Sequence, residues 1–235
     1  STQPLEYEDH QPPLYYLLAT PIYLLFDGAL LPLRLLSVVL GASLLVVAFG
    51  TTRATFSGRS TLAVIAAAFI AFIPQHVAIT AGVNNDTLAE LIVGGTLWAL
   101  VVYVRGRSAQ SPEPKQPTVA RPGADQPWHV GLLLAGALLT KTTAYVVVAV
   151  AGAAVAMRWR RERRTWRWAA RQLAWMFMPA LLLSAPWFIR NGLTYGWSDP
   201  LGLARHSAVV EGQPRTSEWL VDYGCIDLLR RMVRT

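Results

Sequence analysis

The chain is organised as long apolar blocks separated by polar or basic segments, not as the alternating pattern of half-buried strands. A helix needs about 20 apolar residues to cross a bilayer, and several blocks approach or reach that length. These blocks are Leu31–Gly50, Thr61–Ala81, Thr87–Val104, the interrupted pair Val130–Leu139 and Ala144–Met157, and Leu173–Ile189. The pattern predicts an all-α fold, a polytopic transmembrane helical bundle of about six spans.

Basic residues are concentrated in three of the segments between these blocks. They are Arg53 and Arg59; Arg105, Arg107, Lys115 and Arg121; and Arg158, Arg160, Arg161, Arg163, Arg164, Arg167 and Arg171. Short loops rich in arginine and lysine stay on the cytoplasmic side of a membrane. We therefore expect all three loops to be cytoplasmic and the polar segments between the other ends of the blocks to be external.

This orientation requires that one short apolar stretch does not cross and that another is broken. Leu14–Phe26 is too short to span comfortably, so we expect an external juxtamembrane helix along the membrane surface. The run Thr140-Lys141-Thr142-Thr143 must interrupt the helix, because one continuous helix through Met157 would put the third basic loop outside. The Pro-rich segment 105–128 is expected to be a cytoplasmic linker.

Composition supports a membrane protein. The chain is 53% hydrophobic and 15% charged, with a mean hydropathy of +0.35, whereas about 25% of a typical soluble domain is charged. Its single cysteine, Cys225, excludes a disulfide framework and a multi-cysteine metal site. The net charge of +7 does not indicate nucleic-acid binding, because the arginines lie between apolar blocks.

The domain organisation predicted from these features has three parts. Residues 1–30 would end a first external loop with its juxtamembrane helix, residues 31–190 would form the helical core, and residues 191–235 would start another external loop. Because the chain begins with Ser1 and ends soon after a basic stretch, we expect it to be an internal piece of a longer protein.

Polar residues next to the spans fall on the predicted external side, whereas random scatter would place about half of them on each face. They are Glu6–Gln11, Asn84-Asn85-Asp86, Thr140-Lys141, Arg190-Asn191, Asp199 and His206. This one-sided distribution predicts an external active site.

Two cations on that side are candidate phosphate ligands. Lys141 stands between two short apolar helices, where an ionisable group is costly and usually marks a paired or functional site; the alternative is a lysine that extends to the membrane surface. Arg190 follows Trp187, and its planar guanidinium suits phosphate oxygens; the alternative is a headgroup-level anchor.

Two other polar groups have alternatives of their own. Asn84-Asn85-Asp86 precedes an apolar run, so its members could cap the next helix or face a substrate. His10 and His206 could share a divalent metal cation, or be two unrelated histidines.

The run Glu8-Asp9-His10-Gln11-Pro12-Pro13-Leu14-Tyr15-Tyr16 resembles the end of the first external loop in GT-C glycosyltransferases. The similarity is to the protein mannosyltransferase and aminoarabinose transferase group. Further stretches resemble that group in the same order: Asn84-Asn85-Asp86-Thr87-Leu88, Leu138-Leu139-Thr140-Lys141, Pro186-Trp187-Phe188-Ile189-Arg190-Asn191 and Asp199-Pro200-Leu201-Gly202.

The resemblance implies transfer of a sugar from a polyprenyl-phosphate carrier to an acceptor outside a bacterial inner membrane. Gln11 and Tyr15 join Lys141, Arg190, Asn85 and Asp86 as expected substrate or phosphate contacts, with Gln11 replacing a lysine of the family motif. The catalytic carboxylate is expected upstream of Ser1, with Glu8 and Asp9 as weaker candidates, and the aminoarabinose transferase branch implies metal ligands at His10 and His206. The alternative functions are a secondary transporter, suggested by the break at Lys141, and a non-catalytic membrane scaffold.

Overall fold

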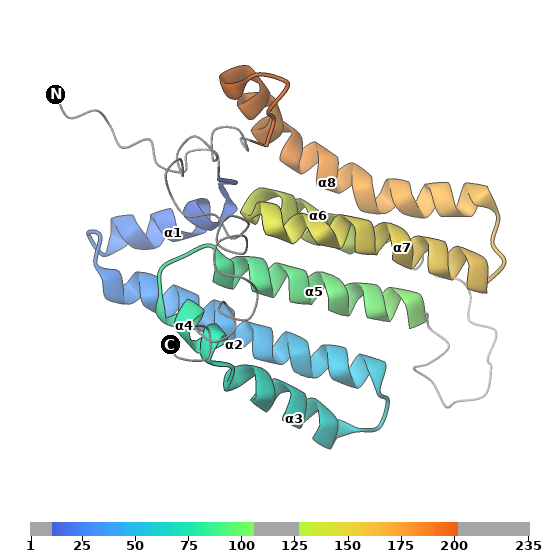
Figure 1. Cartoon of the computed structure of the whole chain (residues 1–235), viewed down its shortest axis with the longest axis horizontal. Helices are drawn as coiled ribbons and strands as arrows, with labels where there is room; N and C mark the ends of the chain where they lie inside the picture. Colours follow the sequence, from blue (N-terminus) through green and yellow to red (C-terminus); the bar gives the residue numbers. More distant parts are fainter. Residues whose placement is uncertain (1–10, 106–126, 202–235) are drawn as a thin grey trace, which may run out of the picture. The chain divides into compact units, whose positions relative to one another are not determined.

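The structure is a computed structural model that describes residues 11–105 and 127–201, and every regular element in those ranges is helical. The chain divides into two units, residues 11–190 and residues 1–10 with 191–235, and each is described by itself. The elements are α1 (Leu14–Leu25), α2 (Leu30–Thr55), α3 (Ser60–Ala71), α4 (Pro74–Ala81), α5 (Asp86–Arg105), α6 (Trp128–Thr140), the short 3₁₀ helix η2 (Thr142–Tyr145), α7 (Val146–Arg161) and α8 (Trp166–Tyr195). Figure 1 shows these helices in sequence colours.

Four helical segments are long and apolar enough to cross a membrane: α2, α5, η2 with α7, and α8. The bent pair α3 and α4 makes a fifth if it counts as one span. The predicted all-α membrane bundle is therefore confirmed. The predicted count of about six depends on α6, which has 13 residues and falls below the length that a simple crossing needs.

The predicted block Thr61–Ala81 is not one straight helix, and this is a correction to the sequence analysis. The chain bends by 61° between α3 and α4. Pro74, the first residue of α4, has no backbone N–H and forces Ile73 into an extended conformation, with φ −67° and ψ 118°. A proline near the middle of an apolar block was the available signal for this bend.

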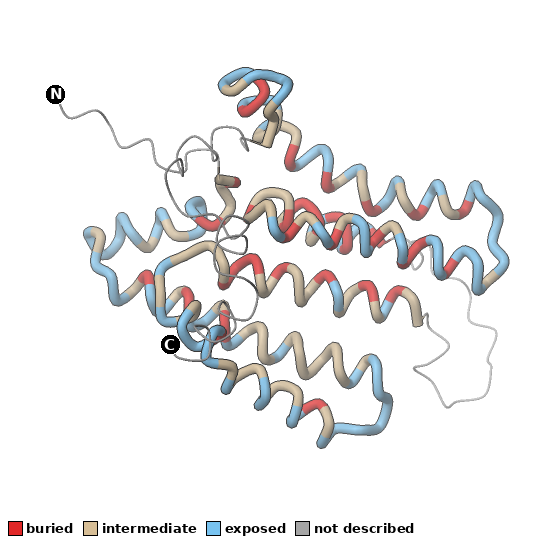
Figure 2. Tube along the Cα trace, in the orientation of Figure 1, coloured by how far each residue is buried: buried red, intermediate tan, exposed pale blue. Residues whose placement is uncertain are grey.

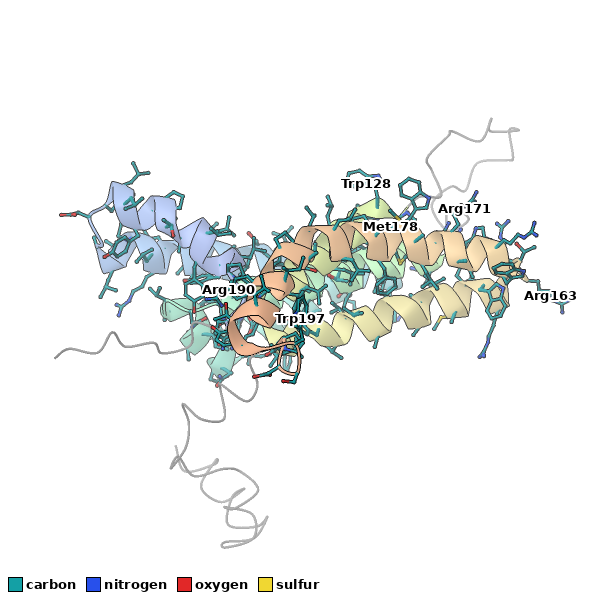
Figure 3. The ribbon with its side chains drawn as sticks, turned by 90° about the horizontal axis from the view of Figure 1, so that it is seen from above. Trp128, Arg163, Arg171, Met178, Arg190 and Trp197 are labelled. Atoms are coloured by element: carbon teal, nitrogen blue, oxygen red, sulfur yellow. The ribbon has the colours of Figure 1, made fainter. Side chains whose placement is uncertain are left out.

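The short helix α1 packs alongside the first part of α2. A tight turn joins the two helices, with Asp27 and Gly28 both at positive φ. In Figures 1 and 3, α1 runs alongside the first part of α2. At 12 residues α1 is too short to span, as predicted, and its expected position along the membrane surface stays a prediction.

The buried core of residues 11–190 lies where α5, α6, α7 and α8 face one another, as the red segments of Figure 2 show. Val130, Leu134, Val147 and Met176 are at most 1% exposed. Large apolar side chains such as Phe69 and Phe72 on the outside are instead 70% and 82% exposed. An exposed apolar surface of this extent suits contact with lipid chains.

The described parts of the basic segments lie at one end of this unit. The Arg105 guanidinium donates to the carbonyl of Ala54 and to the Ser57 hydroxyl, and Arg161 donates to the Val104 carbonyl. The first loop, the end of α5 and the end of α7 are therefore neighbours, as the alternating direction of the helices predicted (Figure 1). We call this the basic end, and the opposite end, with the α4–α5 loop and η2, the polar end.

Candidate functional site at the polar end

The helix break predicted at Lys141 is present and reverses the chain. Helix α6 ends at Thr140, whose hydroxyl donates back to the Gly136 carbonyl at 2.6 Å. Lys141 is extended, with φ −162° and ψ 141°, and η2 then leads into α7. Figure 1 shows α7 running back alongside α6, so the break is a turn between antiparallel helices. The lysine is thereby held at the end of the bundle and not at its middle.

Lys141 forms an ion pair with a carboxylate 55 positions earlier in the chain. Its Nζ lies 2.5 Å from Asp86 Oδ1, and the two side chains are 23% and 39% exposed. Asn85 supports the same contact, since its Nδ2 lies 3.5 Å from the Thr140 carbonyl. Asp86 is also in the first turn of α5, where a negative charge interacts favourably with the helix dipole.

The capping alternative holds for Asn84, whereas Asn85 and Asp86 make longer-range contacts. The Asn84 Oδ1 accepts from the Asp86 N–H at 3.0 Å, and its Nδ2 donates to the Ile79 carbonyl at 3.2 Å. The Asn85 carbonyl accepts the first helical N–H, from Ala89. The tripeptide thus both starts α5 and presents two side chains to the break at Lys141.

Arg190 lies at the polar end of α8. Figure 3 shows it at the opposite end of this helix from Arg171, and far from Arg163. Its guanidinium carbon is 5.1 Å from the centroid of the Trp187 ring, the contact expected of the anchor alternative. Two residues before Arg190, the Phe188 ring meets the Tyr145 ring edge to face at 6.3 Å. Because Tyr145 ends η2 and donates to the Leu138 carbonyl, the end of α8 adjoins the segment that carries Lys141.

A pocket of about 270 Å³ opens beside the α4–α5 loop. It is lined in part by three tyrosines of α1 and by two asparagines of the loop: Tyr15, Tyr16, Tyr23, Asn84 and Asn85. Tyr15 is 2% exposed and also packs in the core. Neither the Tyr15 hydroxyl nor Gln11 Oε1 has a hydrogen-bond partner within the described residues. Tyr15 therefore lies at the polar end, where the sequence analysis expected a substrate contact.

A second carboxylate of α5 has a side-chain partner that the sequence did not predict. His76 Nδ1 of α4 lies 3.0 Å from Glu90 Oε2 of α5, one helical turn after Asp86. His76 is 8% exposed. Its side chain faces α2, because the side chains of His76 and Thr80 lie against Gly41 of that helix. This contact depends on the bend at Pro74, which the periodicity of the block did not reveal. A histidine within an apolar block was the remaining signal.

Four predicted residues lie outside the described part of the chain: Glu8, Asp9, His10 and His206. The expected His10–His206 metal site is therefore not placed. Within residues 11–105 and 127–201, no group of three histidine, cysteine, aspartate or glutamate side chains could hold a metal ion.

Comparison with known proteins supports the resemblance stated above. Residues 10–113 match a family model described as dolichyl-phosphate-mannose-protein mannosyltransferase. Neither a curated protein nor a solved structure matches the chain. The matched region contains α1 to α5 and the carboxylate of Asp86, while its partner Lys141 and Arg190 lie beyond it. The family match, together with the helical membrane bundle, supports the GT-C superfamily of membrane glycosyltransferases for this chain.

Proposed function

We propose that the protein transfers a sugar from a polyprenyl-phosphate carrier to an acceptor on the extracytoplasmic face of a bacterial inner membrane. The family match supports a membrane glycosyltransferase of the GT-C type, and the carrier, the face and the membrane are our proposal. The single observation that supports it most is the convergence of Asp86, Lys141 and the end of α8 at the polar end.

The chemistry of the two cations suits a lipid phosphate. A lysine ammonium has three N–H donors, and the bond to Asp86 uses one of them. Asp86 then orients Lys141 and does not itself contact phosphate, because two anions would repel each other. Arg190 has a planar fork that matches two phosphate oxygens. Both cations would stabilise the negative charge that develops on the departing lipid phosphate.

The other side chains of the polar end have supporting roles in this proposal. Gln11, Tyr15 and Asn85 contribute uncharged donors or aromatic surface near the α4–α5 loop, where a sugar or an acceptor would lie. We expect the base that activates the acceptor to lie outside the described residues, as the candidates Glu8 and Asp9 do. The acceptor is a hydroxyl or amine of a lipid, glycan or protein.

The transporter alternative rested on the break at Lys141 as a discontinuous span. That break reverses the chain between α6 and α7, whereas transporters with discontinuous helices hold their substrates near the middle of the membrane. The scaffold alternative required that the polar residues fail to converge, and Asn85, Asp86 and Lys141 do converge. Both observations favour the glycosyltransferase.

The test is binding of a short-chain polyprenyl phosphate to the chain in lipid nanodiscs, measured by calorimetry. Lys141→Ala and Arg190→Ala should each weaken binding about tenfold or more, because a hydrogen bond to a charged group contributes about 1.5–3 kcal/mol. Arg171→Ala is the matched control, since it removes the same charge from the other end of α8 (Figure 3). Equal weakening by Arg171→Ala and Arg190→Ala, or no binding by the unchanged protein, contradicts the proposal.

A further inference from the structure

The turn between α7 and α8 at the basic end has an unusual concentration of one charge. Between Arg158 and Arg171 the chain has seven arginines and a single carboxylate, Glu162. Like charges this close repel one another, so the segment favours an anionic partner. It lies far from Arg190 in Figure 3, and it adjoins the end of α5 whereas Lys141 contacts the start of that helix. The proposed transfer site therefore does not account for it.

Two of these arginines fix the turn from within. Arg158 is buried, donates to Glu162 at 2.7 Å, and stacks on Tyr103 and Trp168 with its guanidinium carbon 4.8 and 5.3 Å from their ring centroids. Arg164 donates to the other oxygen of Glu162 at 2.9 Å. These contacts join α5, α7 and α8, so the turn has a defined shape before any partner binds.

Besides Arg161, which donates to the Val104 carbonyl, the segment has further arginines at its surface. Arg160, Arg163 and Arg167 are exposed, and Arg163 is in the left-handed region, with φ 50°, where the chain changes direction. Figure 3 shows Arg163 at the tip of the basic end. Next to them Trp166 is 69% exposed, and the Arg167 guanidinium carbon is 5.9 Å from its ring centroid. We call Arg160, Arg163, Arg167 and Trp166 the arginine surface.

We propose that the arginine surface is a binding site for the phosphate of an anionic phospholipid, such as phosphatidylglycerol. Guanidinium groups bind phosphate oxygens through two parallel hydrogen bonds. Exposed tryptophan is favoured at the depth of lipid headgroups, which places the arginines level with lipid phosphates. Because Glu162 already holds Arg158 and Arg164, the surface groups are not neutralised by the only carboxylate of the turn.

The experiment uses the full chain in nanodiscs of phosphatidylcholine with increasing phosphatidylglycerol. Lipids that remain bound are counted by native mass spectrometry, and the unfolding temperature is measured in parallel. The unchanged protein should retain phosphatidylglycerol in preference to phosphatidylcholine and should unfold at a higher temperature as its fraction rises. The double variant R163Q/R167Q should lose most of that preference, about tenfold, because it removes two of the guanidinium groups that would bind phosphate. Both side chains are exposed, so the fold should be retained.

The matched control is R53Q/R59Q, which removes the same charge from two exposed arginines of another loop at the basic end. Equal loss from both double variants indicates diffuse attraction to a charged bilayer and overturns a defined site. Equal retention of phosphatidylcholine and phosphatidylglycerol by the unchanged protein also overturns it. The same rise in unfolding temperature from inorganic phosphate, added to phosphatidylcholine nanodiscs, identifies a free-anion site instead of a lipid site.

Discussion

The two ends of the helical unit handle charge in different ways. At the basic end the cations outnumber the carboxylates, and several guanidinium groups bind carbonyl oxygens or aromatic faces. At the polar end Lys141 forms an ion pair with Asp86, 55 positions away, and the His76 ring contacts the carboxylate of Glu90. Arg190 adds a further cation there, beside Trp187.

We infer that the same charged residue types have different functions at the two ends. Charges at the basic end fix one turn, so their removal should affect folding and lipid contact. Charges at the polar end meet at breaks in helices, where backbone and side-chain groups are available to a ligand. Their removal should affect binding and transfer more than folding.

The largest effect is expected from Arg190→Ala on sugar transfer. Loss of one donor that stabilises developing negative charge costs about 2.7–4 kcal/mol, so turnover should fall about 100- to 1000-fold at equal protein level. Transfer from a polyprenyl-phosphate sugar by the full-length protein in isolated membranes measures this. Arg158→Ala provides the contrast, because it should reduce the amount of folded protein and leave the turnover of the folded fraction unchanged. An equal fall in turnover per folded molecule would remove Arg190 from the mechanism.

The next effect is expected from Arg158→Ala on the free energy of unfolding. Arg158 and Arg164 both bind Glu162, but their side chains are 11% and 47% exposed. Breaking a buried ion pair costs about 3–5 kcal/mol. Arg158→Ala should approach the lower value, because Glu162 is 23% exposed and keeps Arg164 as a partner. Arg164→Ala should cost less than about 1 kcal/mol, as exposed pairs do. Equal destabilisation of the two variants in an unfolding assay would show that burial does not separate them.

A smaller effect is expected for the coupling between Asp86 and Lys141. The variants Asp86→Asn, Lys141→Gln and the double variant form a thermodynamic cycle whose interaction energy isolates the pair. We expect about 1–2 kcal/mol, within the range of contacting residues, because both side chains are partly exposed. Asp86→Asn should also retain polyprenyl-phosphate binding, whereas Lys141→Gln should weaken it. Equal loss of binding in both single variants would mean that the intact pair is needed as a structural unit.

The smallest effect is expected from the titration of Glu162. Burial opposes its ionisation, but the hydrogen bonds and positive charges of Arg158 and Arg164 outweigh it and hold the pKa of Glu162 below its ordinary value of 4.5. A lowered folded-state pKa contributes stability that is present above pH 4.5 and is lost as the pH falls through the folded value. The unfolding temperature of the unchanged protein should therefore decline more steeply below pH 4.5 than that of Glu162→Gln. Parallel declines would contradict this contribution.

Several features of the site followed from local sequence. The break at Thr140-Lys141 was required by the positions of the arginines, and it is present. The polar tripeptide before α5 predicted a helix start, and Asn84 caps it. The helix start depends on interactions within a few residues, and the break follows from the requirement that the basic loops share one side of the membrane. Both can be predicted from composition and spacing.

Contacts between distant parts of the chain could not be predicted from local sequence. The partner of Lys141 is 55 positions away, and nothing in the spacing distinguishes Asp86 from other carboxylates on the same side. The His76–Glu90 contact requires the bend of 61° between α3 and α4. The sequence placed Arg158 in a basic loop with its neighbours, yet it lies in the last turn of α7, buried and stacked on two aromatic rings. Such contacts depend on how helices rotate and approach one another, which periodicity does not define.

The helical class, the alternating direction of successive helices and the end at which each group of charges lies could be predicted from the sequence. The reason is that the bilayer imposes its own rule on every segment: apolar residues cross, arginines remain on one side, and polar groups gather at the ends. The tertiary structure alone decided which charges meet. Pairing of Asp86 with Lys141, and burial of Arg158 beside Glu162 and Trp168, require packing of helices from distant parts of the chain.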